Sequence, residues 1–398
     1  MNLKDIVVPK SVFPVIENIS DLLPYIQDKK EIAVSNRSNG TTVVCYNVED
    51  GDTFSNDYAR ECRGLVFDTA TGNIIGRPLH KFFNLGENDK VQISDLDWTR
   101  VVAVWDKLDG SMVTAHRVNG VVDFKTKKSF DSDVVIAAKA FIKDKAQNVY
   151  DFCDEIVDEF TPIFEYTSPE RRIVIGFDED KLTLLHVRHI KTGAYIPLTD
   201  PALRELIEKH NVDVLSPVNL KKDENGALDV QDLLSFLKTA QQIEGYVIQF
   251  EHDMVKVKCD WYRNAHKVVS FLRERDVVRM VLEASIDDAK AFIAEVGYSI
   301  KPIEDLEHRV VSEINAIAYD VEDVKALSAS KNMSVKDIAI AYKDHPYRSL
   351  IMNAVRGVEN DYVDYYKKHF LKNFSLNEVK IDRISGNSVF ILRDSETN

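Results

Sequence analysis

The pattern of hydrophobic and polar positions divides the chain into two parts. Up to about residue 265, short runs of alternating and β-branched apolar residues recur, which is typical of strands. Between these runs, other segments have the three- and four-residue apolar spacing of amphipathic helices. Strands are expected within 31–48, 101–106, 181–188, 243–250 and 254–258, and helices within 133–160, 201–210 and 230–240. The first part, 1–265, is therefore predicted to be an α+β domain with antiparallel sheets and flanking helices.

From residue 266 onward the pattern is helical. Apolar residues recur every three or four positions and glycine is almost absent, which predicts an all-α C-terminal domain over 266–398. Its last stretch, 381–398, is expected either to return as a short strand or to be frayed. Two further local predictions concern the first domain. Residues 161–177 are expected to form a pair of strands, and Lys125 and Lys127 in F-K-T-K to share one strand face, because side chains two positions apart point the same way.

Composition limits the class of protein. No apolar run is long enough to cross a bilayer, and the N-terminus lacks the apolar core of a signal peptide. The four cysteines, at 45, 62, 153 and 259, have no C-x-x-C spacing and are expected to be reduced thiols of a cytosolic protein. The net charge of −14 gives no overall field that would attract nucleic acid. Any nucleic-acid site must therefore be a local basic groove.

Basic and acidic side chains on the predicted strands are the candidates for chemistry. Lys107 ends a buried strand and begins K-L-D-G-S, so its amine is positioned by a turn. In M-V-K-V-K, Lys256 and Lys258 fall on one strand face. Glu165 and Glu244 also lie on or next to strands. Each feature alone is also what a half-exposed strand of an ordinary protein contains, but together they fit a pocket for a polyanion.

In their order along the chain, these motifs resemble those of the covalent nucleotidyltransferases, the ATP-dependent ligases and capping enzymes. The successive motifs are K-L-D-G-S, I-F-E-Y, L-L-H-V-R, I-E-G-Y-V and V-K-V-K. Local signatures narrow the resemblance to the phage-type RNA ligase 1 family: E-C-R-G, K-F-F-N-L-G-E, F-K-T-K, F-E-Y-T-S-P-E-R-R-I-V and K-V-K-C-D-W-Y. The resemblance covers 45–262 well and continues weakly through the helical domain.

The resemblance implies a role for each matching residue. Lys107 would attack the α-phosphate of ATP, and Glu165 and Glu244 would lie near this lysine and the ribose or metal. Neighbouring cations favour the neutral, nucleophilic form of an amine, which Lys256, Lys258 and a bound metal ion would supply while holding the triphosphate. The catalytic set is then Lys107, Glu165, Glu244, Lys127 and Tyr262; the nucleotide contacts are Tyr46, Arg63, Lys81, Lys107, Glu244, Lys256 and Lys258.

Three positions leave alternatives open. Phe83 and Val247 are candidates for packing near the adenine, with plain core packing as the alternative. No aromatic residue is evident opposite the base, because L-L-H-V-R places His186 and Val187 there. Asp287 in S-I-D-D-A-K resembles a metal-binding acid of the family, although Ser285 and Asp287 also make a good helix N-cap.

The function implied by the resemblance is ATP-dependent ligation of RNA 5′-phosphate and 3′-hydroxyl ends through lysyl-AMP and RNA-adenylate, in RNA or tRNA repair. The cofactors would be ATP and Mg²⁺ or Mn²⁺. The partners would be single-stranded RNA or broken tRNA, with no membrane, for a monomer in the cytoplasm of the host cell if the gene is phage-encoded. The alternatives are a DNA ligase or capping guanylyltransferase, which usually carries a small β-barrel after the last motif, and a non-catalytic module that binds RNA ends.

Overall fold

The computed structural model describes residues 3–49, 52–89, 91–171, 173–271, 273–295 and 298–375. The chain divides into two compact units, 1–263 and 264–398. The first unit combines strands and helices, whereas every element that the structure describes in the second unit is a helix. The mixed α+β character, with antiparallel sheets and a helical C-terminal part, is therefore confirmed. Among the described residues, no helix has the length and apolar character needed to cross a membrane.

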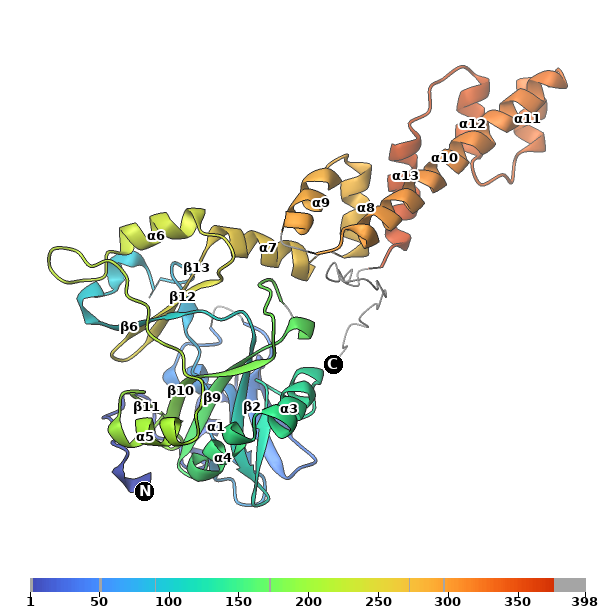
Figure 1. Ribbon diagram of the computed structural model, residues 1–398. Coiled ribbons are helices and arrows are strands. Elements are labelled where there is room, and N and C mark those ends of the chain that lie inside the picture. Colours follow the sequence, from blue (N-terminus) through green and yellow to red (C-terminus); the bar gives the residue numbers. More distant parts are fainter. Residues whose placement is uncertain are drawn as a thin grey trace. The chain divides into compact units, whose positions relative to one another are not determined.

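Three sheets build the first unit (Figure 1). All strand pairs are antiparallel except β5 with β13. One four-stranded sheet has the order β1 (Ile32–Asn36), β2 (Thr41–Tyr46), β3 (Arg63–Asp68), β4 (Ile74–Gly76). The five-stranded sheet has the order β11 (Tyr195–Ile196), β10 (Lys181–His189), β9 (Phe160–Thr167), β7 (Ser111–Val118), β8 (Val121–Lys125). The third sheet has the order β5 (Phe83–Asn84), β13 (Met254–Lys258), β12 (Gly245–Phe250), β6 (Val101–Asp106).

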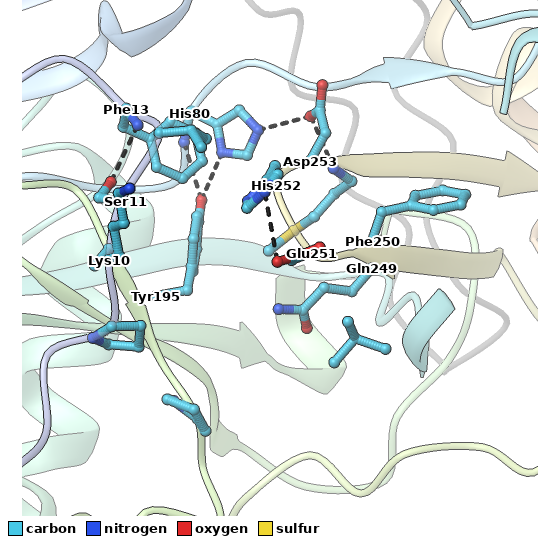
Figure 2. Close-up of a pocket in the computed structure, with 16 residues that line it drawn as sticks. Lys10, Ser11, Phe13, His80, Tyr195, Gln249, Phe250, Glu251, His252 and Asp253 are labelled. Carbon is cyan, nitrogen blue, oxygen red and sulfur yellow. Dashed lines mark hydrogen bonds and ion pairs between the residues drawn. The ribbon is translucent and has the colours of Figure 1, made fainter. Parts of the chain in front are cut away.

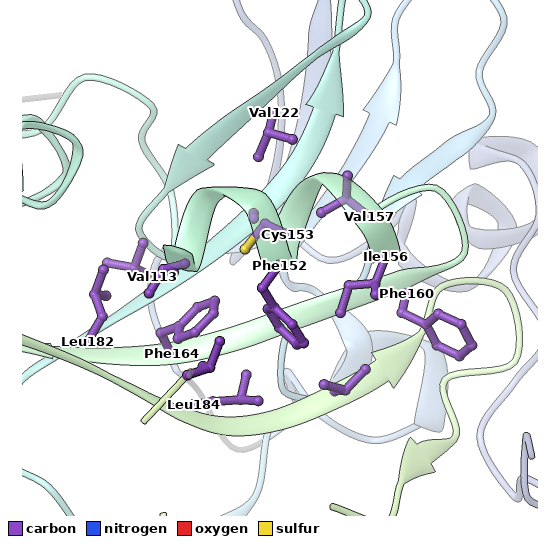
Figure 3. Close-up of a cluster of buried hydrophobic side chains, with 14 of the residues drawn as sticks. Val113, Val122, Phe152, Cys153, Ile156, Val157, Phe160, Phe164, Leu182 and Leu184 are labelled. Atoms are coloured by element: carbon purple, nitrogen blue, oxygen red, sulfur yellow. The ribbon is translucent and has the colours of Figure 1, made fainter. Parts of the chain in front are cut away.

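Helices of the first unit flank these sheets. They are α1 (Ile19–Ile26), α2 (Asp57–Glu61), α3 (Asp133–Lys145), α4 (Gln147–Ile156), α5 (Pro201–Lys209) and α6 (Val230–Thr239). The helical pattern over 133–160 is thus split at Ala146, and Phe160 already begins β9. Helix α4 buries Phe152 and Ile156 together with Phe164 of β9 and Leu184 of β10 in one hydrophobic core cluster (Figure 3). This apolar contact fixes the position of β9, the strand that carries Glu165.

Two local predictions are wrong. Only the first half of 161–177 is a strand, β9, and its partners are β10 and β7. After Thr167 a short 3₁₀ turn (Pro169–Arg171) follows, and the backbone N–H groups of Val174 and Ile175 donate to a side chain instead of a strand ladder. In F-K-T-K, strand β8 ends at Lys125, so Lys125 and Lys127 do not share a strand face.

The second unit is an assembly of helices. They are α8 (Glu274–Leu282), α9 (Ile286–Glu295), α10 (Lys301–Ser330), α11 (Val335–Ala341), α12 (Arg348–Val355) and α13 (Tyr362–Phe370), while α7 (Asp260–Phe271) contains the division between the units. The long helix α10 packs against α8, α12 and α13. Its buried residues include Val310, Ile317 and Val321, which recur at the spacing expected of an amphipathic helix. The prediction for 381–398 lies outside the described residues.

Candidate active site

One buried carboxylate, that of Glu244, holds two of the predicted lysines. Glu244 is only 3% exposed and precedes β12. Its Oε2 lies 2.9 Å from Nζ of Lys107, and its Oε1 lies 2.8 Å from Nζ of Lys258. The backbone supports this arrangement, because Lys107 N donates to Gly245 O at 2.9 Å and Gly245 pairs with Lys258 across the sheet. The ends of β6, β12 and β13 therefore bring Lys107, Glu244 and Lys258 together.

Asp109, two residues after Lys107, was not among the predicted site residues. It is 3% exposed, and its Oδ1 accepts a hydrogen bond of 2.5 Å from the Tyr262 hydroxyl. Its Oδ2 accepts bonds of 2.7 and 2.6 Å from the N–H groups of Val174 and Ile175. Asp109 thus ties the K-L-D-G turn to α7 and to the segment after β9. Its position after a buried strand and before a glycine is the sequence signal that could have identified it.

Tyr262, one of the predicted catalytic residues, lies in this same cluster. It is buried, and the ring lies 5.0 Å from Nζ of Lys258. Burial raises the pKa of the Tyr262 hydroxyl far above its ordinary value, and the carboxylates of Glu244 and Asp109 raise it further. The phenol therefore remains a hydrogen-bond donor at any physiological pH.

Glu165 presents a carboxyl group with unusual acidity. It lies on β9, opposite Met112 of β7. Burial raises the pKa of Glu165 to about 7, and Glu244 adds to that rise, whereas Lys107 and the Gly110 backbone N–H oppose it. Glycine is required at position 110, where the turn after Lys107 passes close to β9, because an added Cβ would lie 2.5 Å from the carbonyl oxygen of Tyr166. Glu165 can therefore gain or lose a proton near neutrality in the field of Lys107.

The lysines of β13 alternate with buried valines. Val255 and Val257 are buried, and Lys256 and Lys258 point to the other face, as the alternation predicted. Burial lowers the pKa of Lys256 to about 7, with further lowering by the cations Lys81 and Arg63. Burial is thus the main cause of the lowered pKa, and the neighbouring cations add to it.

Aromatic rings separate the gathered cations. Nζ of Lys256 lies 5.4 Å, and Cζ of Arg63 5.8 Å, from the centre of the Phe82 ring. Nζ of Lys127 lies 3.5 Å from the centre of the Tyr46 ring. Cation–π contacts of this kind stabilise positive charge without neutralising it, so the cations keep their attraction for phosphate. Phe82 was not predicted from the sequence.

Lys81 occupies an aromatic enclosure. Its Nζ lies 4.7 Å from the Phe83 ring centre, 5.1 Å from that of Phe54 and 5.9 Å from that of Tyr46. The same Nζ contacts both carboxylate oxygens of Glu49, at 2.5 and 2.6 Å. Phe83 thus contributes to the environment of a predicted nucleotide-binding lysine, and Phe54 was missed by the motif comparison.

Some predicted residues lie elsewhere. Asp287 is on α9 in the second unit, 88% exposed, and pairs with Lys290 at 2.9 Å. Over the part of the chain that the structure describes, no group of three or more His, Cys, Asp or Glu side chains could hold a metal ion, so the metal role of Asp287 stays a prediction. His186 is buried on β10 between the rings of Trp105 and Tyr195. Val247 packs beside a small core cluster that contains Phe82.

A cavity of about 220 Å³ lies in the first unit but away from this cluster (Figure 2). It is lined by residues 9–13, by Tyr195 and by the β12–β13 turn, and by none of the predicted site residues. Along it, the His80 ring bonds to the Tyr195 hydroxyl at 2.7 Å and to Asp253 at 2.9 Å. Asp253 in turn pairs with Arg60 at 2.7 Å. These polar groups hydrogen-bond to one another, which indicates a structural role for the network.

Comparison with known proteins identifies the family. A family model described as RNA ligase matches residues 61–262, just over half of the chain, and the chain belongs to the RNA ligase family. Among curated proteins, it is 26% identical over 325 residues to "Putative RNA ligase" of Thermovibrio ammonificans, covering 77% of this chain and 82% of that protein. It is 25% identical over 283 residues to RNA ligase 1 of bacteriophage TS2126, covering 68% and 67%.

A solved structure of an archaeal ATP-dependent RNA ligase also resembles this chain, with a TM-score of 0.40 and 14% identity, covering 79% of this chain and 80% of that one. The family resemblance drawn from the motifs is confirmed by the family match, and the protein is an RNA ligase. The family match supports an RNA ligase over the capping-enzyme and DNA-ligase alternatives.

Proposed function

We propose that this protein is an ATP-dependent RNA ligase that joins 5′-phosphate and 3′-hydroxyl ends through a lysyl-AMP intermediate. The observation that supports this proposal most directly is the cluster around Glu244. One buried carboxylate positions Lys107 at a strand end and Lys258 opposite it. Lys256 and Arg63 share the Phe82 ring, and Lys81 lies near the ring of Phe83, the next residue in the sequence. An amine held in place near Lys256 and Arg63, which form no ion pair among the described residues, suits attack on a polyanionic nucleotide.

In the first step, Nζ of Lys107 attacks the α-phosphorus of ATP. A nitrogen–phosphorus bond forms, the bond from the α-phosphorus to the bridging oxygen breaks, and pyrophosphate leaves with that oxygen. The amine must lose a proton during the step, and Glu165, whose pKa burial raises to about 7, is a suitable acceptor near neutrality. Lys256 and Lys258 offset the charge that develops on the leaving pyrophosphate.

The remaining predicted residues fit supporting roles. Lys81, Arg63 and Tyr46 would contact the nucleotide or its phosphates, with Lys127 close to the Tyr46 ring. Tyr262 would orient the cluster through Asp109. Phe83 is our candidate for packing beside the adenine.

Mg²⁺ or Mn²⁺ is the expected cofactor. Magnesium is usually held by one or two carboxylates together with substrate phosphates and water, so Glu165 and Glu244 fit such an ion without a cage of protein ligands. Asp287 is retained as a further candidate ligand. When bound, the ion would neutralise phosphate charge and polarise the α-phosphate.

Two further steps complete the cycle. The 5′-phosphate of an RNA strand attacks the phosphorus of lysyl-AMP, which releases Lys107 and forms RNA-adenylate. The 3′-hydroxyl of the second end then attacks the activated 5′-phosphate, and AMP leaves. These steps depend on positioning and charge stabilisation, which the cluster of lysines and arginines would provide.

Incubation with α-³²P-ATP and Mg²⁺ tests the first step. We expect label to remain on the wild-type protein in a denaturing gel, and Lys107→Ala to retain at least 100-fold less. Lys191→Ala, which removes an exposed lysine of the same unit, is the matched control and should label normally. Absence of any adduct would remove the proposed mechanism, and labelling from GTP alone would point to capping chemistry.

We also propose a role in RNA repair, with single-stranded RNA or broken tRNA as the substrate, and a monomeric protein in the cytoplasm. Four free, buried thiols agree with a reducing compartment. Rates of joining on a nicked anticodon loop and on an unstructured 5′-phosphorylated RNA, measured with and without residues 266–398, would test the tRNA preference. Equal rates on both substrates would contradict it.

A further inference from the structure

A group of four cations comes from the end of β1, the start of β3 and the turn after β8, and two of its members lie outside the predicted site residues. We call Arg37, Arg63, Lys127 and Lys128 the basic patch. Arg37 follows β1 and is exposed, and its NH2 donates to Lys128 O at 3.0 Å. None of the four side chains has a carboxylate partner within 4.0 Å among the described residues. In a chain of net charge −14, unpaired cations gathered in one place call for an external anion.

The backbone beneath the patch is held rigidly. Lys125 is fully buried at the end of β8, and its Nζ donates to the carbonyl oxygens of Thr126 and Lys127 at 2.9 and 3.1 Å. The turn is closed by a bond of 2.9 Å from Thr126 N to Ser129 O. Gly64, with a φ of +102°, allows the turn to lie against β3, because an added Cβ would be 2.2 Å from Lys127 O. The turn that carries Lys127 and Lys128 is therefore preorganised rather than a loose loop.

The patch is continuous with the nucleotide-binding cluster. The Tyr46 ring has Nζ of Lys127 at 3.5 Å and Nζ of Lys81 at 5.9 Å. Arg63 likewise connects the two groups of cations, because it belongs to the basic patch and shares the Phe82 ring with Lys256. A chain of phosphates bound on the patch could therefore extend to the nucleotide-binding cluster that contains Lys107.

The number of cations indicates what kind of anion the patch fits. They come from three places in the chain: Arg37 follows β1, Arg63 begins β3, and Lys127 and Lys128 lie in the turn after β8. Four cations carry more positive charge than a single phosphate balances, whereas a strand with a regular row of phosphates offers one negative charge to each.

From these observations we propose that the basic patch binds the sugar–phosphate backbone of the RNA strand to be joined and leads its end to the nucleotide cluster. This inference rests on the proposed function. Arg37 and Lys128 are the residues that it adds, because neither belongs to the predicted nucleotide contacts. Phosphate contacts of this kind position a strand without reading its sequence.

Fluorescence anisotropy with a 5′-phosphorylated, dye-labelled 12-nucleotide RNA tests the proposal. We expect Arg37→Ala/Lys128→Ala to bind about tenfold more weakly at 50 mM salt, with a slope of log K against log salt smaller by about 1.4, since each single-strand phosphate contact contributes about 0.7. Arg37→Lys/Lys128→Arg, which keeps both charges, should retain the slope. Lys222→Ala/Lys238→Ala removes two exposed lysines elsewhere in the same unit and should bind like wild type.

A second measurement separates this inference from the function on which it rests. Self-adenylylation should be unchanged in Arg37→Ala/Lys128→Ala, while transfer of AMP to the RNA falls in proportion to the lost binding. Wild-type RNA affinity and salt slope in this variant would overturn the patch even if adenylylation is normal. Failure of the wild-type protein to form lysyl-AMP would instead overturn the proposed function.

Discussion

At the scale of single residues, Glu244 and Glu165 show how one cluster gives two carboxylates different tasks. Glu244 contacts two ammonium groups, so its charge is matched by direct partners. Glu165 forms no ion pair within 4.0 Å among the described residues, and burial raises its pKa to about 7. The motifs predicted both glutamates, but they could not distinguish the two, because the difference comes from tertiary burial. Asp109 and Phe82 were not among the predicted site residues, and their contacts likewise come from segments far apart in the sequence.

The raised pKa of Glu165 predicts a pH-dependent stability. The pKa rises from 4.5 to about 7 on folding, so between these values the folded state binds more protons than the unfolded state. The free energy of unfolding therefore falls as the pH rises through this window. Glu165→Gln removes the penalty, and its stability relative to wild type should increase by roughly 2–3 kcal/mol from pH 4.5 to pH 8.

Urea denaturation at several pH values measures this difference. Glu205→Gln, at an exposed position of α5, serves as the control and should follow the wild-type profile. A constant difference between Glu165→Gln and wild type across the window would contradict the assignment.

Lys256 predicts proton uptake on nucleotide binding. Burial and neighbouring cations lower its pKa to about 7, so at pH 7.5 a large fraction of this side chain is neutral. A bound triphosphate favours the ammonium form, and binding should take up about half a proton per ATP. Titration calorimetry in buffers of different ionisation enthalpy measures this number.

Lys256→Arg should abolish the uptake, since a guanidinium is charged at all accessible pH values. The same substitution at the exposed Lys191 should leave the uptake at its wild-type value. Equal proton uptake by wild type and Lys256→Arg would show that another group titrates.

At the scale of elements, a buried ionic group links α2, β10 and the segment after β4. Glu61, at the end of α2, bonds to Arg77 at 3.0 Å and to Arg188 of β10 at 2.7 and 2.8 Å. All three side chains are 0–1% exposed. Because Arg63 begins β3 two residues after Glu61, this group also fixes where the basic cluster starts.

Glu61→Gln should destabilise the first unit by about 3–5 kcal/mol, because it leaves two buried guanidinium groups without a counter-charge. Urea denaturation monitored by tryptophan fluorescence measures the change. Glu17→Gln breaks the exposed pair with Lys191, at 58–61% side-chain exposure, and should cost less than about 1 kcal/mol. Similar losses for the two variants would contradict a special role for the buried group.

The sequence predicted elements well where one periodicity dominates and failed where a side chain competes with the backbone ladder. Alternating residues identified β12, β13 and β10, and helical spacing identified α5 and α6 to within a few residues. The apolar run R-I-V-I-G-F looked equally strand-like, but Asp109 takes the N–H groups of Val174 and Ile175 that a strand would donate. That competition depends on a residue more than sixty positions away, so a local pattern could not reveal it.

At the scale of the whole molecule, charge is distributed unevenly. The chain has 65 Asp and Glu residues and 51 Lys and Arg residues. Even so, cations that form no ion pair among the described residues lie around Tyr46 and Phe82. The sequence predicts that any nucleic-acid site must be local, and its motifs name Arg63 and Lys127 of the proposed basic patch. Arg37 and Lys128 were not predicted from the sequence, because they lie near each other only through the fold.

The division into 1–263 and 264–398 predicts unfolding in more than one step, since each unit has its own buried core. The three tryptophans, Trp98, Trp105 and Trp261, all lie in the first unit, whereas ellipticity at 222 nm includes the helices of the second. Fluorescence and ellipticity should therefore give different urea transitions. Glu61→Gln should shift the fluorescence transition and leave the second component of the ellipticity in place; a single transition that moves as a whole in both signals would show that the two units unfold together.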